Sequence, residues 1–78
     1  MRTLDLHGVL HEDAEFIIEK FITDNFAKLP VKIITGHSSF FKEEVRRCAL
    51  KYELGRQPES FYNSGAWIIY EFEWQKNE

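Results

Sequence analysis

The chain is 78 residues long, which is enough for one small domain. Ten lysines and arginines against thirteen aspartates and glutamates give a formal net charge of −3, which argues against a histone-like protein that grips duplex through overall positive charge. Hydrophobic residues make up 44% of the chain and aromatic residues 15%, so a disordered chain is not expected. We expect one domain over residues 1–74 and a short polar tail over 75–78.

The sequence predicts neither an intramolecular disulfide nor a membrane-spanning or secretory segment. The single cysteine, Cys48, leaves no partner for an intramolecular disulfide or a zinc knuckle. The longest unbroken apolar run covers residues 66–70, far short of the roughly 20 residues that a membrane span needs. Asp5 interrupts the apolar stretch that a secretory leader requires. We therefore expect a cytoplasmic protein with no membrane partner.

The first half of the chain predicts a strand, a helix and a second strand. Apolar and polar residues alternate over 2–6, which indicates a strand that ends at Gly8. Apolar residues then recur at helical spacing, and this helix should run from about residue 12 to 27. Residues 31–35 are rich in β-branched side chains and lie between proline and glycine, so they predict the second strand.

The second half predicts another helix and a hairpin. Ser38 or Ser39 can cap the start of the helix, and Gly55 is suited to the left-handed position that ends it. The last two strands are expected at 57–62 and 66–74, around a turn at 63–65.

The resulting order, β-α-β-α-β-β, predicts an α+β fold. Right-handed crossovers place both helices on one face of a four-stranded mixed sheet, giving a two-layer α/β sandwich. On the last strand, Ile68, Tyr70 and Phe72 are expected to face the core. Trp67 is then expected on the opposite, partly open face of the sheet.

Two loops carry residue types that suit phosphodiester cleavage. Asp5 and His7 are two residues apart and project from one face near the end of the first strand. The second loop contains Thr35, Gly36, His37, Ser38 and Ser39. Because ligands gather at the carboxyl ends of strands in β-α units, the loops together offer an acid–base pair and donors for negative charge. The alternatives are that Asp5 only caps a turn and that the second loop only caps a helix.

The segments LDLHG at 4–8 and TGHS at 35–38 resemble the two motifs of the small MutS-related (Smr) domain family. The resemblance covers roughly residues 4–70 and implies a stand-alone Smr domain. The implied fold is similar to the C-terminal domain of bacterial translation initiation factor three. Ser38 stands where the second motif of the family has its second glycine. The resemblance implies endonuclease activity on DNA or RNA, in some members at stalled ribosomes, without a tightly held cofactor.

Positive charge is concentrated in the middle of the chain. Six of the ten lysines and arginines lie within residues 30–58, where three glutamates reduce the net charge to +3. Lys42 and Arg46 are one helical turn apart and close to the second loop, so they are expected to bind phosphates beside the cut site. The alternative is a solvated helix face with internal ion pairs. So few phosphate contacts suit single-stranded or looped RNA better than long duplex, with Phe40, Phe41 and Trp67 as candidates for base stacking.

The leading hypothesis is an endonuclease that cleaves RNA or nicked and structured DNA. The candidate catalytic residues are Asp5, His7 and His37, and the candidate phosphate-binding residues are Thr35, Gly36, Ser38, Ser39, Lys42 and Arg46. The backbone amides of Gly36 and Ser38 are expected to hold the scissile phosphate. No metal site and no cofactor are predicted. One alternative is a non-catalytic module that binds nucleic acid or a ribosomal surface. The other is a protein-binding domain that uses the acidic first helix and the open sheet face.

Overall fold

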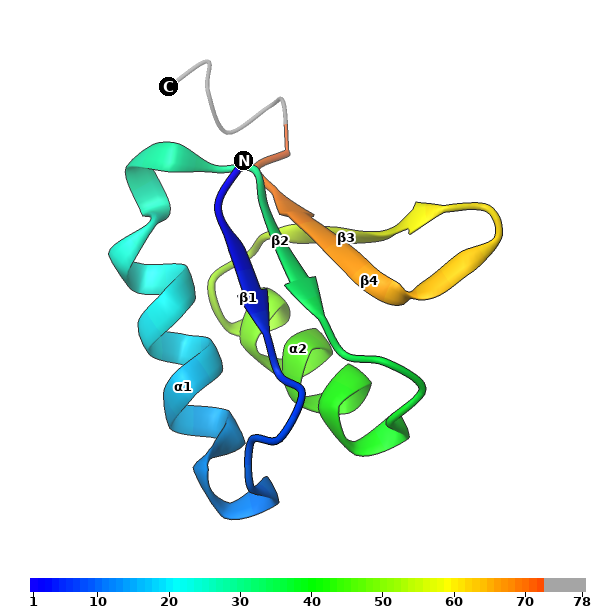
Figure 1. The fold of residues 1–78 in the computed structure, drawn as a ribbon. Coiled ribbons are helices and arrows are strands. Elements are labelled where there is room, and N and C mark those ends of the chain that lie inside the picture. Colours follow the sequence, from blue (N-terminus) through cyan, green and yellow to red (C-terminus); the bar gives the residue numbers. More distant parts are fainter. Residues whose placement is uncertain (73–78) are drawn as a thin grey trace.

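Two helices pack on one face of a four-stranded sheet in the computed structural model, which describes residues 1–72 (Figure 1). The strands are β1 (Thr3–Asp5), β2 (Val31–Ile34), β3 (Gly55–Ser60) and β4 (Asn63–Tyr70). The helices are α1 (His11–Asp24) and α2 (Ser39–Lys51), with a short 3-10 helix, η1 (Phe26–Lys28), after α1. The predicted β-α-β-α-β-β order and the α+β sandwich are confirmed.

The strand order of the sheet is β1-β2-β4-β3. β1 pairs with β2 in parallel, with Asp5 opposite Ile34, and β4 runs antiparallel to both of its neighbours. Because β1 and β2 are parallel, both end at the same end of the sheet, and β4 begins there. We call this the carboxyl end of the sheet. It carries residues 5–8 after β1 and residues 35–39 after β2.

The core lies between the sheet and the two helices. Val31, Ile33 and Ile69 are fully buried on the helix-facing side of the sheet. Pairing with β2 decides which side chains of β4 point towards the helices, because Ile69 lies opposite the buried Val31. The helices contribute further buried residues, namely Ala14, Ile18, Ile22, Phe41, Val45, Cys48 and Ala49.

The predicted orientation of the last strand is wrong. Ile69 is fully buried, whereas Ile68 and Tyr70 are half-buried on the other face. Trp67 lies on the same face as Ile69 and is half-buried, with the Arg56 guanidinium 5.2 Å from its ring centroid. Both faces of this segment are apolar, so alternation along the strand could not distinguish them.

The predicted hairpin turn is also misplaced. The chain reverses at Phe61 and Tyr62, and Gly65 lies inside β4. The carbonyl of Gly65 accepts hydrogen bonds from two amides of the loop after β2, and this contact requires extended chain at Gly65. A register shift between Pro58 and Ser60 accommodates the new turn. β4 ends at Tyr70, and the predicted strand beyond residue 72 and the tail at 75–78 lie outside the described residues.

The C-terminal ends of both helices differ from their predicted positions. α1 ends at Asp24, because the side chain of Asn25 turns back and donates to the carbonyl of Phe21 at 2.7 Å. After α2, the left-handed residue is Glu53, with φ of 57°, and not Gly55. Gly55 instead starts β3, where the ring of Tyr70 occupies the space that a Cβ atom would need.

Candidate functional site

The loop after β1 turns the chain sharply and leaves His7 in solvent. The parallel ladder ends with the amide of Leu6 donating to the carbonyl of Ile34 at 3.0 Å. Asp5 Oδ1 then accepts from the backbone amide of His7 at 2.9 Å, and Gly8 takes a positive φ of 82°. Asp5 therefore caps the turn, as the structural alternative predicted. The imidazole of His7 is exposed.

The loop after β2 is fixed by β4. The amides of Thr35 and Gly36 both donate to the carbonyl of Gly65, at 2.8 and 2.9 Å. The hydroxyl of Thr35, which is 5% exposed, donates to the carbonyl of Gly36 at 3.0 Å. These two amides are therefore unavailable to a phosphate, contrary to the expected role of the Gly36 amide. Thr35 and Gly36 shape the loop, and Gly36 does so with a positive φ of 61°.

The N-terminus of α2 supplies the donors that remain. Ser38 is the N-cap, and its Oγ accepts from the amide of Phe41 at 3.1 Å. The carbonyl of Ser38 accepts from the amide of Lys42 at 3.1 Å. The amides of Ser39 and Phe40 lie in the first turn and have no helical acceptor. Together with the helix dipole, they form the part of this loop best suited to an anion.

Two histidines lie at this end of the sheet. His7 follows β1, and His37 lies between Gly36 and the N-cap Ser38; both are exposed. Within residues 1–72, neither imidazole makes a hydrogen bond, an ion pair or a ring contact. Imidazole is a common acid–base group in catalysis, and both of these side chains are accessible to a ligand.

The cations of α2 divide into paired and unpaired groups. Glu43 Oε1 accepts from Arg46 Nε at 3.0 Å, and Glu43 Oε2 lies 3.4 Å from Arg47 Nε. The hydrogen bond from Arg46 lowers the pKa of Glu43 to about 2, and the charge of Arg47 adds to this effect. Lys42 has no ion pair within the described chain. Of the two predicted phosphate-binding cations, Lys42 is therefore free and Arg46 is already balanced by Glu43.

The starts of the two helices are in contact at this end. The ring of His11 stacks on Phe40, with 4.1 Å between centroids and 9° between planes, and meets Phe41 edge-on at 5.2 Å. Of the three aromatic residues expected to stack on bases, Phe41 is buried and Trp67 is half-buried under Arg56. Phe40 is 37% exposed, with one face covered by His11.

Sequence reasoning missed the most exposed aromatic pair of the described chain. Phe61 and Tyr62 form the hairpin turn and are 96% and 94% exposed. They lie at the end of the strand expected at 57–62. The available signal was their adjacency: two neighbouring residues of a strand point to opposite faces, and only one face of this sheet was expected to be covered.

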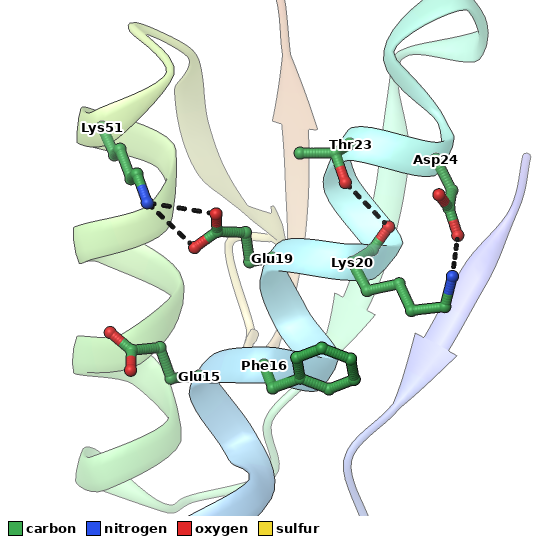
Figure 2. Close-up of a pocket in the computed structure, with 7 residues that line it drawn as sticks. All are labelled: Glu15, Phe16, Glu19, Lys20, Thr23, Asp24 and Lys51. Atoms are coloured by element: carbon green, nitrogen blue, oxygen red, sulfur yellow. Dashed lines mark hydrogen bonds and ion pairs between the residues drawn. The ribbon is translucent and has the colours of Figure 1, made fainter.

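A separate groove of about 640 Å³ runs along the outer side of α1 (Figure 2). Its lining residues are Glu15, Phe16, Glu19, Lys20, Thr23, Asp24 and Lys51. Its cations are paired within it, Lys51 with Glu19 at 3.0 Å and Lys20 with Asp24 at 3.1 Å. Three carboxylates against two ammonium groups make this groove unsuited to a polyanion.

Other kinds of reaction centre find little support. Burial raises the pKa of Cys48 to about 11, so its thiol stays protonated and is a poor nucleophile at neutral pH. Residues 1–72 contain no cluster of three or more histidine, cysteine, aspartate or glutamate side chains placed to hold a metal ion. Over the same residues, no helix combines the length and apolar character that crossing a membrane requires.

A scan of protein-family models finds no matching family, and searches of curated proteins and of solved structures find no significant match. The Smr resemblance therefore rests on the motifs at 4–8 and 35–38 and on the order of the elements.

Proposed function

We propose that this chain is a nucleic-acid endonuclease of the Smr type, acting at the carboxyl end of the sheet. One observation carries the proposal. Parallel pairing of β1 and β2 brings an exposed, unpartnered His7 to the same end of the sheet as the N-terminus of α2. An acid–base group and preorganised donors for negative charge are the two groups that phosphodiester cleavage needs.

The roles follow from the contacts. The amides of Ser39 and Phe40 bind the scissile phosphate, and the Lys42 ammonium binds a neighbouring one. His7 acts as the general base on the attacking hydroxyl, and His37 is the candidate acid for the leaving oxygen. Asp5 is a positioning residue, because its carboxylate holds the backbone of His7 in the turn. Single-stranded or looped RNA is the proposed substrate, and nicked or structured DNA is the alternative.

The test is cleavage of end-labelled single-stranded RNA and nicked DNA by the wild type and by His7→Ala. We expect the wild type to cleave and His7→Ala to be slower by about 10²- to 10⁴-fold. The circular dichroism spectrum and the unfolding midpoint should stay the same, because the His7 imidazole has no partner in the described fold. Lys28→Ala, an exposed change in η1, serves as the matched control and should keep full activity. An inert wild type, or a fully active His7→Ala, would overturn the proposal.

The second candidate is a non-catalytic module that binds nucleic acid or a ribosomal surface. It is favoured by the hydrogen bond of Asp5, whose Oδ1 engages the backbone amide of His7 and not its imidazole. No carboxylate–imidazole pair is therefore formed among residues 1–72. This candidate predicts salt-dependent RNA binding without cleavage, with equal affinity for the wild type and His7→Ala. Cleavage that depends on His7 would exclude it.

A further inference from the structure

The β3–β4 hairpin ends in two aromatic side chains that the fold does not bury. Phe61 and Tyr62 are 96% and 94% exposed, and their rings meet edge to face with 5.4 Å between centroids. The core is closed without them by the residues between the sheet and the helices. Large apolar rings exposed side by side at a turn mark a binding surface more often than a structural need.

The hairpin lies beside the loop that leads into the candidate site. Gly65 is bonded through its carbonyl to the amides of Thr35 and Gly36, so β4 touches the loop that leads into α2. From Gly65 back to Tyr62 the chain has three residues, which span roughly 10 Å at about 3.3 Å per residue. In Figure 1 the hairpin projects from the body of the molecule on the side of this loop. A single strand held at the phosphate-binding amides would therefore reach the aromatic pair within a few nucleotides.

The charges of the hairpin restrict what can bind. Lys32 is paired with Glu59 at 2.7 Å, and Asn63 donates to the same carboxylate at 3.2 Å. Arg56, the one lysine or arginine within residues 55–70 of the hairpin, lies over the ring of Trp67. The tip therefore presents two aromatic rings without the cluster of free lysines that anionic membranes attract. Rings of this kind stack on any unpaired base, because every base has a π-face.

We propose that Phe61 and Tyr62 form a stacking platform for unpaired bases of a single-stranded nucleic acid whose backbone is held at the carboxyl end of the sheet. This inference rests on the proposed function and makes it more specific. Duplex is disfavoured as a substrate, because its bases are stacked within the helix and cannot reach the platform. The bases that stack are those a few nucleotides from the cut, so the platform selects unpaired regions without reading sequence.

The test compares two fluorescent 12-nucleotide strands of 2′-O-methyl RNA, which resist cleavage through the 2′ position. One strand carries all its bases, and the other has abasic sites at its centre but the same number of phosphates. Fluorescence anisotropy should show that the wild type binds the complete strand at least about fivefold more tightly. The double variant Phe61→Ala/Tyr62→Ala should bind both strands equally, with its affinity for the abasic strand unchanged.

Two further variants serve as matched controls. Tyr62→Phe keeps both rings and should keep the preference for bases. Phe16→Ala removes a ring that is 70% exposed on α1 and should also leave the preference unchanged. Because Phe61 and Tyr62 are almost fully exposed, the double variant should fold normally, as circular dichroism would show.

The outcomes separate the two proposals. If the wild type binds both strands equally, the platform is refuted while the nuclease proposal stands. If it binds neither strand, both proposals fail. If the double variant instead loses binding to neutral lipid vesicles, with base preference unaltered, the aromatic pair is a membrane contact and the platform is wrong.

Discussion

The helical layer and the carboxyl end of the sheet differ in how their polar side chains are used. In the helical layer, most of the cations are paired within the protein. Glu19 accepts from the hydroxyl of Tyr52 at 2.6 Å and from Lys51 at 3.0 Å, and these bonds lower the pKa of Glu19. Glu43 likewise holds Arg46. Such pairs link α1 to α2 or stiffen one helix, and they occupy four of the five lysines and arginines of the two helices.

At the carboxyl end of the sheet, several polar groups are unpaired. His7, His37 and Lys42 have no side-chain partner within residues 1–72. Two first-turn amides of α2 also lack a helical acceptor. Unpaired groups add little to the stability of the fold but can bind a ligand. Substitutions in the body of the molecule should therefore change stability, and substitutions at the carboxyl end should change binding and cleavage.

The largest effect on stability is expected from a substitution in the core, on the helix-facing side of β4. Ile69→Ala removes a fully buried side chain and should lower the free energy of unfolding by about 2–5 kcal/mol. A single small core rarely supplies more than about 3–5 kcal/mol, so this variant should be largely unfolded at 37 °C. Urea unfolding followed by tryptophan fluorescence measures the change.

Ile68→Ala is the matched control on the opposite face of β4. Ile68 is half-buried, so its truncation should cost clearly less than that of Ile69. A larger loss for Ile68→Ala would mean that Ile68 faces the core after all, and the register of β4 against β2 would be wrong.

A smaller effect should separate the two cations near the start of α2. Lys42→Gln should weaken binding of single-stranded RNA about fivefold at 0.1 M salt, and should reduce the slope of log affinity against log salt by about 0.7. Arg46→Gln should change binding less than about twofold. Its charge is already balanced by Glu43, and Arg47 remains to pair with that carboxylate. Equal losses in the two variants would show that Arg46 leaves Glu43 to bind phosphate.

The smallest effect concerns pH and the ion pairs of α2. The pKa of Glu43 is lowered from 4.5 to about 2, so its pairing with Arg46 stabilises the fold above pH 4.5. That contribution is lost as the pH falls through 2. The unfolding midpoint of Glu43→Gln should therefore lie slightly below that of the wild type at pH 7, and the two should converge towards pH 2. The difference should shrink in high salt because the pair is exposed. A difference that is independent of pH would contradict this.

Much of the fold follows from local sequence patterns. The spacing of apolar residues predicted each helix and strand in order, and Ser38 was one of the two expected caps of α2. The placement of the loops after β1 and β2 at one end of the sheet followed from the parallel pairing of these strands. These features depend on neighbours within a few residues or on general rules of chain topology, and both are legible in a sequence.

The errors in the hairpin and in the loop after β2 come from contacts between distant segments. The turn lies at Phe61 and Tyr62, and not at 63–65, because Gly65 is hydrogen-bonded to the loop after β2, about thirty residues earlier. The face of β4 was set by pairing with β2, since the strand is apolar on both sides. The Gly36 amide was expected to be free for phosphate, but the same contact with Gly65 occupies it. No local pattern indicates such partners.

The central claim is that nucleic acid binds at the carboxyl end of the sheet and not along the helical layer. An ¹H–¹⁵N NMR titration of His7→Ala, which is expected not to cut its ligand, with single-stranded RNA tests it most directly. We expect the largest shift changes at Gly8, Ser39 and Phe40 and at the hairpin tip, with the α1 groove unaffected. Shift changes confined to residues 15–24 of α1, or none at millimolar RNA, would contradict the claim.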